Sequence, residues 1–527
     1  MSSVTVSILH SERIFPRTKQ DSEETIALSL LDATTVNFAH TCSTWLCEAP
    51  ETAAGPEFDL ADHLRQSLRV ALDAYPQWCG RINAITTLDG AAGPHTQRFG
   101  RVYVQYGTPQ DPGVEFRVAE TTTTLDTVCP ALRAVDQPVW NRQEIPPEKF
   151  VPSTPLSNAL QPDVLDDAGL FPPLLAIQLT NLACGGFILT VKIVHPLADI
   201  QSLVYFVKDW ASVSRSILSN TPCPTLNPLF EPGLLDSLAA GDIDAVEPDM
   251  AIIQRAKSMP LHRYDWWASS PNSPWPVKVP EALAGKMLSP AGKPMPWSEW
   301  NITEPVSHYV VHLGINQHDA ILAHVWSCIN RARNLEEDSQ PVHCDLVYGV
   351  RPAFKLDKSF LGSPMLMINV EMSSADVTAG SRPCNIPALQ SIAQRIRQTI
   401  GEVSQPDLLA AHLHSVAYEE SPQRIWQAFL GRRHILVTSW ARAGLYEIDF
   451  GLRSSPIIRY ADSFIPDMDG TIVIKEAPPL KKEDTSDGSL PSSWTANGVD
   501  ISLRLRSEDM DRLLRDPMLF PQNTSNE

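Results

Sequence analysis

The stretch "LLAIQLTNLACGGFILTVKIVHPLADIQS", residues 174–202, holds two β-rich runs, a glycine turn and the start of a helix. The runs at 174–179 and 187–194 are rich in Leu, Ile and Val, and "CGG" at 184–186 is typical of a turn. The sequence therefore predicts a strand pair. Because side chains alternate along a strand, alternate positions from 187 to 193 share a face with His195. We expect the second strand to carry His195 toward the interior.

A helix is expected directly after this histidine. Apolar residues recur at helical spacing from Ile200 to Ala211, and Asp199 is a suitable N-cap. Pro196 ends the strand, so the imidazole lies at a strand-to-helix corner. An unperturbed pKa near 6.5 suits a general base. The H-x-x-x-D spacing is also compatible with a buried core histidine beside a helix-capping aspartate.

The length and the pattern along the chain predict an α/β protein with two domains. A chain of 527 residues is longer than a single domain with one hydrophobic core usually is. Helical spacing occurs at 61–75, 316–333 and 508–516. Strand-like runs in the second half occur at 343–350, 366–371, 434–439, 446–450, 457–460, 471–475 and 499–505. A Pro- and Trp-rich segment, 219–300, separates a domain at 1–218 from a domain at 301–527.

Charge and cysteine usage exclude several classes of function. The formal net charge of −19 argues against sequence-independent binding to nucleic acid or to an anionic membrane. The nine cysteines form no C-x-x-C pair, so we expect no metal site and no redox motif. The N-terminus does not have the pattern of a secretory signal, and no apolar run reaches 18 residues. We expect a cytoplasmic protein with reduced cysteines.

The segment 174–202 resembles the H-x-x-x-D region of the BAHD-type, CoA-dependent acyltransferases. The likeness is strongest to their fungal branch of secondary-metabolite O-acyltransferases, which is trichothecene O-acetyltransferase-like. Further motifs follow in the family's order. They are "LSLLD" at 28–32, similar to an N-terminal strand motif, "LRQSLRVALDAYPQWCGRI" at 64–82, "DAILAHVWSCINRAR" at 319–333, "VTSWARAGLYEIDFG" at 437–451 and "VDISLRLRSEDMDRLLRD" at 499–516.

This resemblance implies two similarly built chloramphenicol-acetyltransferase-like domains, each a mixed sheet flanked by helices, joined by a long crossover loop. It implies that His195 is the general base, that Asp199 supports it structurally with Arg351 as partner, and that Asp449 shapes the fold. Thr438 and Trp440 are expected near the oxyanion, or else are a strand threonine and a packed tryptophan. The co-substrate is expected to be an acyl-CoA, with acetyl-CoA first, and no cofactor is expected to be bound. The acceptor would be a hydroxylated natural product, and the protein a monomer.

The site for the CoA phosphates is not assigned by the sequence. Five arginines between 432 and 459 outnumber the two acids there, but arginines also decorate exposed strand ends. Two departures from the family pattern, Ile200 for glycine and "LRS" at 452–454 for "x-G-K", keep open a non-catalytic homologue that binds a metabolite. A condensation-type enzyme is a further alternative. Such enzymes carry a second histidine where this chain has Val194.

Overall fold

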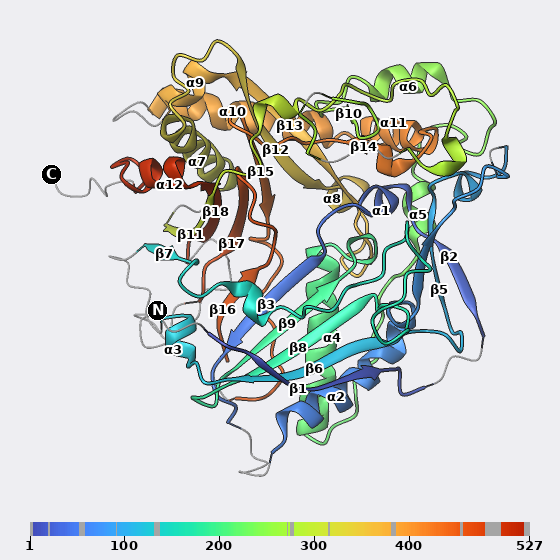
Figure 1. The fold of residues 1–527 in the computed structure, drawn as a ribbon, viewed down its shortest axis with the longest axis vertical. Helices are drawn as coiled ribbons and strands as arrows, with labels where there is room; N and C mark the ends of the chain where they lie inside the picture. Colours follow the sequence, from blue (N-terminus) through green and yellow to red (C-terminus); the bar gives the residue numbers. More distant parts are fainter. Residues whose placement is uncertain are drawn as a thin grey trace.

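Two large mixed β-sheets with helices around them form the molecule (Figure 1). The computed structural model describes residues 4–18, 22–51, 58–90, 92–130, 138–270, 272–274, 279–314, 317–380, 386–453, 457–479 and 497–520. Within these ranges the α/β class expected from the sequence is confirmed. No helix among them combines the length and the apolar character needed to cross a membrane.

The first sheet contains six strands in the order β1-β6-β8-β9-β3-β16 among the described residues. Its strands are β1 (Ser7–Ile14), β3 (Thr41–Cys47), β6 (Val114–Thr121), β8 (Leu175–Leu182), β9 (Phe187–Ile193) and β16 (Ile458–Ser463). β8 and β9 pair antiparallel, as the opening stretch predicts. All seven residues of β9 are buried, so this strand lies at the centre of the fold.

The second sheet has the order β13-β12-β15-β17-β18-β11-β7 in the same part of the chain. Its strands are β7 (Val139–Asn141), β11 (Val306–Leu313), β12 (Pro341–Gly349), β13 (Met365–Ser373), β15 (His434–Ser439), β17 (Thr471–Glu476) and β18 (Val499–Arg506). Two small sheets complete the set. They are formed by β2 (Glu24–Ala27), β4 (Arg81–Ala84) and β5 (Val102–Tyr106), and by β10 (Tyr264–Asp265) and β14 (Ile425–Trp426).

The two halves of the chain exchange strands. β16 comes from the second half and pairs antiparallel with β3 at the edge of the first sheet. β7 comes from the first half and pairs antiparallel with β11 at the edge of the second sheet. The domain division at 218 and 300 stays a prediction. Each large sheet contains one strand from the other side of this division, β16 in the first sheet and β7 in the second.

The helices lie outside the sheets. α2 (Leu60–Ala71) and α4 (Ile200–Leu218) pack together against the first sheet, while α7 (His318–Ala332), α10 (Ile386–Val403) and α12 (Ser507–Leu514) lie beside the second (Figure 1). The others are α1 (Leu30–Thr34), α3 (Leu125–Val128), α5 (Pro232–Asp236), α6 (Met250–Ala256), α8 (Arg351–Phe354), α9 (Ser374–Ala379) and α11 (Pro406–Ala417). α2, α4, α7 and α12 correspond to helices predicted from apolar spacing.

The segment 219–300 has little regular structure, as its composition predicts. It is attached to the second half of the chain, because β10 pairs with β14 and Asp265 accepts two hydrogen bonds from the buried Arg424. Trp297 packs with Tyr264, Met295 and Phe429 in a small apolar cluster. Trp275, one of its five tryptophans, lies outside the described residues.

Two sequence predictions are wrong in their local structure. Residues 446–450 form no strand, because Asp449 makes a turn in which its Oδ1 accepts the N–H of Gly451 at 2.8 Å. The motif at 28–32 starts a helix instead of a strand. Ser29 is the N-cap of α1, and its side chain forms a capping box with Asp32.

Candidate active site

His195 lies in the short connection between β9 and α4. β9 ends at Ile193, and a 3-10 turn begins at His195 and ends at Leu197. The N–H of Val194 donates to the carbonyl oxygen of Leu174 at 3.0 Å, which fixes the end of the strand. The turn, and not the alternation of the strand, therefore sets the direction of the imidazole.

One imidazole nitrogen of His195 is held by Ser363. Nδ1 lies 3.0 Å from Oγ of Ser363, and the same Oγ lies 2.5 Å from the carbonyl oxygen of His195. Because a carbonyl only accepts, the serine hydroxyl donates to it and accepts from Nδ1–H. This tautomer leaves a lone pair on Nε2, which a general base requires.

The surroundings of His195 keep its ring neutral. Burial lowers its pKa from 6.5 to about 4, while the negative charge of Asp199 acts in the opposite direction. The ring of Phe38 meets the imidazole edge-on, with 5.4 Å between the ring centroids. A neutral ring can accept a proton, so His195 has the form of a base at and well below neutral pH.

Asp199 is the N-cap of α4, as its position predicts. Its Oδ1 accepts the N–H of Ser202 at 3.0 Å. Both of its carboxylate oxygens accept hydrogen bonds from the guanidinium of Arg351, the partner expected from the family resemblance. Arg351 is 4% exposed and also donates to the carbonyl oxygens of Phe360 and Gly362. Asp199 therefore holds the corner through the helix N-terminus and the arginine.

Residues 362–363 connect this arginine to His195. Gly362 accepts from the N–H of Asp199 at 3.0 Å through its carbonyl, and Ser363 donates its N–H to Oδ1 of Asp32 at 2.5 Å. Gly362 has φ +130°, and a Cβ there would lie 2.8 Å from that same oxygen. Only glycine fits this position. Burial raises the pKa of Asp32 to about 7.

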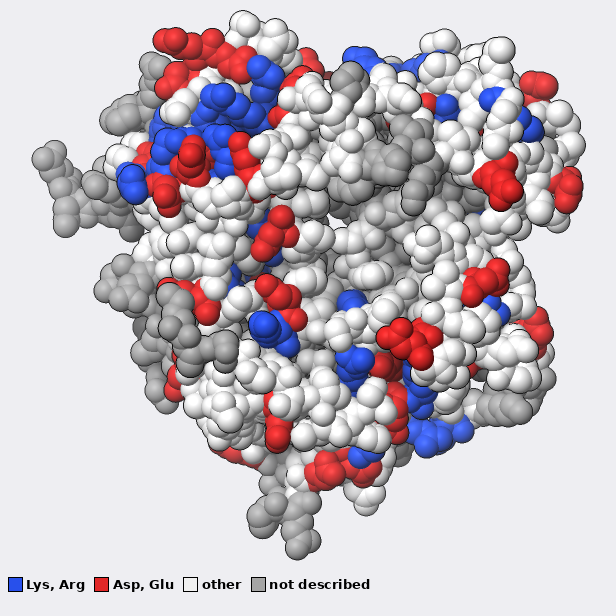
Figure 2. Space-filling view, viewed as in Figure 1, with Lys and Arg blue, Asp and Glu red and all other residues white. Residues whose placement is uncertain are grey.

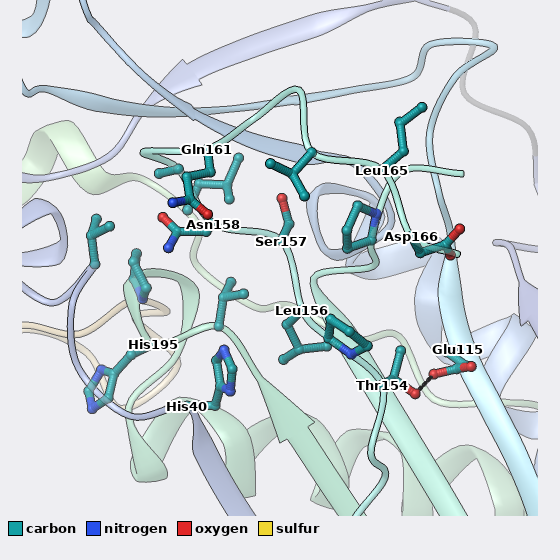
Figure 3. Close-up of a pocket in the computed structure, with 18 of the residues that line it drawn as sticks. His40, Glu115, Thr154, Leu156, Ser157, Asn158, Gln161, Leu165, Asp166 and His195 are labelled. Atoms are coloured by element: carbon teal, nitrogen blue, oxygen red, sulfur yellow. Dashed lines mark hydrogen bonds between the residues drawn. The ribbon is translucent and has the colours of Figure 1, made fainter. Parts of the chain in front are cut away.

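A cavity of about 600 Å³ opens beside His195. Figure 3 shows His195 and His40 on one side of it and Asn158 and Gln161 on the other, carried by the loop that precedes β8. The lining combines aliphatic side chains with a few polar ones. It includes Val36, Ile82, Leu156, Val164 and Leu165 as well as Ser157, Arg13 and Arg117. Such a mixture is typical of a small-molecule site.

An apolar group on the second sheet also reaches His195 through Phe38. Phe38 contacts both His195 and Trp426 edge-on, and it packs with Leu436 of β15 in a cluster that includes two methionines. Thr438 follows Leu436 by two residues, so both side chains project from the same face of the strand. Thr438 therefore faces the side of the sheet on which Phe38 lies.

Trp440 is placed differently from Thr438. It is 5% exposed and packs in the main core of the first half of the chain, together with Leu445 and Phe450. Its backbone N–H donates to the carbonyl oxygen of Ile474 at 2.7 Å. These contacts are those of a packed tryptophan, and a role beside the oxyanion stays a prediction.

Asp449 has the contacts of a turn residue. Its side chain is exposed, and its backbone carbonyl oxygen accepts from the guanidinium of Arg215 on α4. The next residue, Phe450, is buried and meets Trp210 of α4 edge-on at 5.1 Å. The turn at Asp449 thus inserts Phe450 against the helix that starts at the H-x-x-x-D corner.

The arginines that could contact the CoA phosphates are already close to other groups. Arg433, Arg453 and Arg459 each form ion pairs with one or two carboxylates. Figure 2 shows Lys and Arg side chains gathered at the upper left, whereas the centre of that face is mostly uncharged. The structure therefore gives no reason to assign the phosphate site to one arginine.

Sequence reasoning missed Ser363, Asp32 and the residues of the cavity other than His195. Ser363 follows Arg351 by twelve positions, and no spacing rule connects it with His195. Asp32 lies in a motif recognised from the family, but its contact with Ser363 depends on the tertiary fold. Asn158 and Gln161 belong to a loop without periodicity, so no pattern singled them out.

Comparisons with known proteins show which proteins this chain resembles. Residues 110–248, which include the H-x-x-x-D corner, match the Transferase family. Acyltransferase AFT15-1 of Alternaria alternata is 24% identical, over 98% of this chain and 97% of that protein. Acyltransferase abl6 of Leptosphaeria maculans is 23% identical, over 98% of both chains.

A solved structure, F. sporotrichioides TRI101 complexed with coenzyme A and T-2, shares the fold. Its TM-score is 0.59 at 15% identity, and the likeness covers 94% of this chain and 98% of that one. The fold is accordingly that of two chloramphenicol-acetyltransferase-like domains with a long crossover. The ordered motifs, the family match over residues 110–248 and the relatives along nearly its whole length make this chain similar to the BAHD-type acyltransferases.

Proposed function

We propose that the protein transfers an acyl group, with acetyl as the first expectation, from a CoA thioester to a hydroxyl group of a secondary metabolite. The observation that carries this proposal is the state of His195. Its Nδ1 is held by Ser363, its ring is kept neutral by burial, and it lines a cavity large enough for a small molecule.

In the proposed reaction, Nε2 of His195 removes the proton of the acceptor hydroxyl. The oxygen attacks the thioester carbonyl, and a tetrahedral intermediate forms with one negative oxygen. When the intermediate collapses, the C–S bond breaks, and His195 returns the proton to the departing CoA thiolate. Both substrates are bound together, so no acyl-enzyme forms.

Thr438 is the proposed donor to the negative oxygen. Its position on the same face of β15 as Leu436, near Phe38, supports this role. One well-placed donor lowers such a barrier by about 3–4 kcal/mol. Trp440 was the other expected donor, and its buried packing makes it the weaker candidate.

Acyl-CoA as co-substrate is supported by the family and by the solved relative that holds coenzyme A. The acceptor is proposed to bind in the cavity beside His195. Its aliphatic lining suits an apolar skeleton, and Asn158 and Gln161 would orient polar substituents. The proposal also includes that the protein acts as a monomer in the cytoplasm. This part rests on the sequence alone.

The test is an acyl-transfer assay with purified protein. Acetyl-, malonyl- and benzoyl-CoA are each combined with a panel of hydroxylated terpenoids and polyketides, and free thiol and product mass are followed. Transfer to a hydroxyl is expected with at least one pair. If thiol release never exceeds the rate without protein, the proposed function fails.

Two cavity variants test where the acceptor binds. Asn158→Leu and Gln161→Leu are expected to raise the KM for the acceptor and to leave the KM for acyl-CoA unchanged. Gln398→Leu, a change at an exposed glutamine of α10, is the matched control. Unchanged acceptor KM in both cavity variants would move the acceptor elsewhere.

A further inference from the structure

Three histidines from separate segments meet near the beginnings of β12 and β15, two inner strands of the second sheet. His262 belongs to the segment 219–300, His343 to β12, and His434 is the first residue of β15. One ring nitrogen from each lies within 4.8 Å of the others. His343 and His434 are register partners on neighbouring parallel strands, so the sheet itself brings two of the rings together. No sequence spacing indicates this cluster.

A fully buried carboxylate lies beside these rings. Asp345 is 0% exposed and follows His343 by two residues, on the same face of β12. Its Oδ2 accepts a hydrogen bond from the N–H of Phe429 at 3.1 Å. Its Oδ1 lies 3.3 Å from Nε2 of His262, and its Oδ2 lies 3.5 Å from Nδ1 of His434.

Three buried polar atoms in this cluster make no well-aligned hydrogen bond, although each histidine nitrogen among them lies within ion-pair distance of Asp345. They are Oδ1 of Asp345, Nε2 of His262 and Nδ1 of His434. Buried polar atoms are almost always paired, and an exception calls for an occupant such as an ion. A carboxylate in a dry site also needs a positive charge close to it. Here the aromatic side chains of Tyr264 and Phe429 cover the cluster.

Asn369 on β13 makes two contacts that would position the histidines as metal ligands. Nδ1 of His343 lies 3.1 Å from Oδ1 of Asn369, which can fix its tautomer and leave Nε2 available. The N–H of Asn369 donates to the carbonyl oxygen of Pro260 at 2.7 Å and so holds the chain just before His262. Both the ring of His343 and the segment that carries His262 are therefore positioned by the same asparagine on β13.

We propose that His262, His343, His434 and Asp345 bind one zinc ion, which fastens the crossover segment to the second sheet. Zinc takes four nitrogen and oxygen ligands at about 2.0–2.1 Å in a tetrahedron, which places neighbouring ligand atoms about 3.3 Å apart. The distance from Oδ1 of Asp345 to Nε2 of His262, 3.3 Å, already has this size, and Oδ2 of the same carboxylate lies 3.5 Å from Nδ1 of His434. Imidazole nitrogens with one carboxylate suit zinc better than magnesium or calcium, which prefer oxygen ligands.

The experiment measures zinc binding by the full-length protein without a polyhistidine tag. The protein is dialysed against a chelator and titrated with ZnCl2 in competition with a chromophoric chelator, and its Tm is recorded at each stage. We expect one zinc per chain. Removal of zinc should lower the Tm by several degrees, and ZnCl2 but not MgCl2 should restore it.

Variants separate this site from adventitious binding. His262→Gln and His434→Gln are expected to weaken zinc binding by at least about 100-fold, since even outer partners of zinc ligands are worth 10–100-fold. His10→Gln, at an exposed histidine, is the control and should bind like the wild type. Two results overturn the proposal. One is a wild-type Tm that is the same with and without chelator and ZnCl2, which would leave a protonated histidine as the charge beside Asp345. The other is unchanged affinity in both cluster variants. The wild-type comparison decides the matter if the variants do not fold.

Discussion

Replacing Arg351 by methionine is expected to destabilise the protein strongly. Methionine keeps most of the volume of the side chain but removes every hydrogen bond that the guanidinium donates. Asp199 then stays buried without its cationic partner, the carbonyl oxygen of Phe360 loses its donor, and that of Gly362 keeps only the donors from Asp199 and Ser202. Breaking a buried ion pair in this way costs about 3–5 kcal/mol. At about 2 °C per kcal/mol, a value for chains of 150–250 residues, this corresponds to a fall in Tm of roughly 6–10 °C.

The assay is thermal unfolding followed by circular dichroism, with Arg397→Met as the control. Arg397 pairs with Asp319 on the surface and is 63% exposed, so its loss should cost less than about 1 kcal/mol. A Tm of Arg351→Met within 2 °C of the control would refute the inference that the buried pair holds the corner.

The ion pair of Asp199 and Arg351 should link catalytic activity to thermal stability. Arg351 contacts Gly362, the neighbour of Ser363, which holds His195. We therefore expect Asp199→Asn to lower kcat and Tm together, because the asparagine can cap α4 but leaves Arg351 without its carboxylate. Activity lost at an unchanged Tm would instead assign Asp199 a direct chemical role.

Three further predictions concern the corner and the turn that packs on α4. Ser363→Ala removes the group that holds Nδ1 of His195 and should lower kcat about 10-fold with little change in Tm, whereas an unchanged kcat would show that the tautomer needs no such partner. Since burial lowers the pKa of His195 to about 4, and the base acts only when deprotonated, kcat/KM should stay level from pH 8 to about 5 and decline as the pH falls through about 4; an acidic limb near 6.5 in a pH series would contradict this. Asp449→Ala should lower Tm slightly through the lost hydrogen bond to Gly451 and leave kcat per folded molecule unchanged, and a large loss of kcat at constant Tm would give Asp449 a chemical role.

Periodicity predicted the elements that bury one continuous apolar face. α2 and α4 have clear helical spacing, and the strand pair β8 and β9 is marked by its glycine turn. The N-cap at Asp199 follows from local chemistry alone, since the carboxylate needs only the first turn of its own helix. Such features depend only on residues that are close in the sequence, so they can be predicted from one amino-acid sequence.

Features that depend on distant neighbours could not be predicted in this way. The alternating pattern at 446–450 looks like a strand, but Ile448 and Phe450 pack in the core of the first half of the chain while Asp449 turns the backbone. The direction of His195 comes from a 3-10 turn and from Ser363, 168 residues later. The strand exchange of β7 and β16 leaves no periodic signal, because pairing partners are chosen by the tertiary fold.

The central claim is that His195 is the base of an acyl transfer, and the turnover number of His195→Ala tests it most directly. With the best donor and acceptor pair, we expect kcat to fall by about 10²–10⁴-fold, the usual contribution of a positioned general base. The Tm and the KM for acyl-CoA should remain close to those of the wild type. A variant that folds normally and keeps kcat within a factor of about three of the wild type would contradict the account.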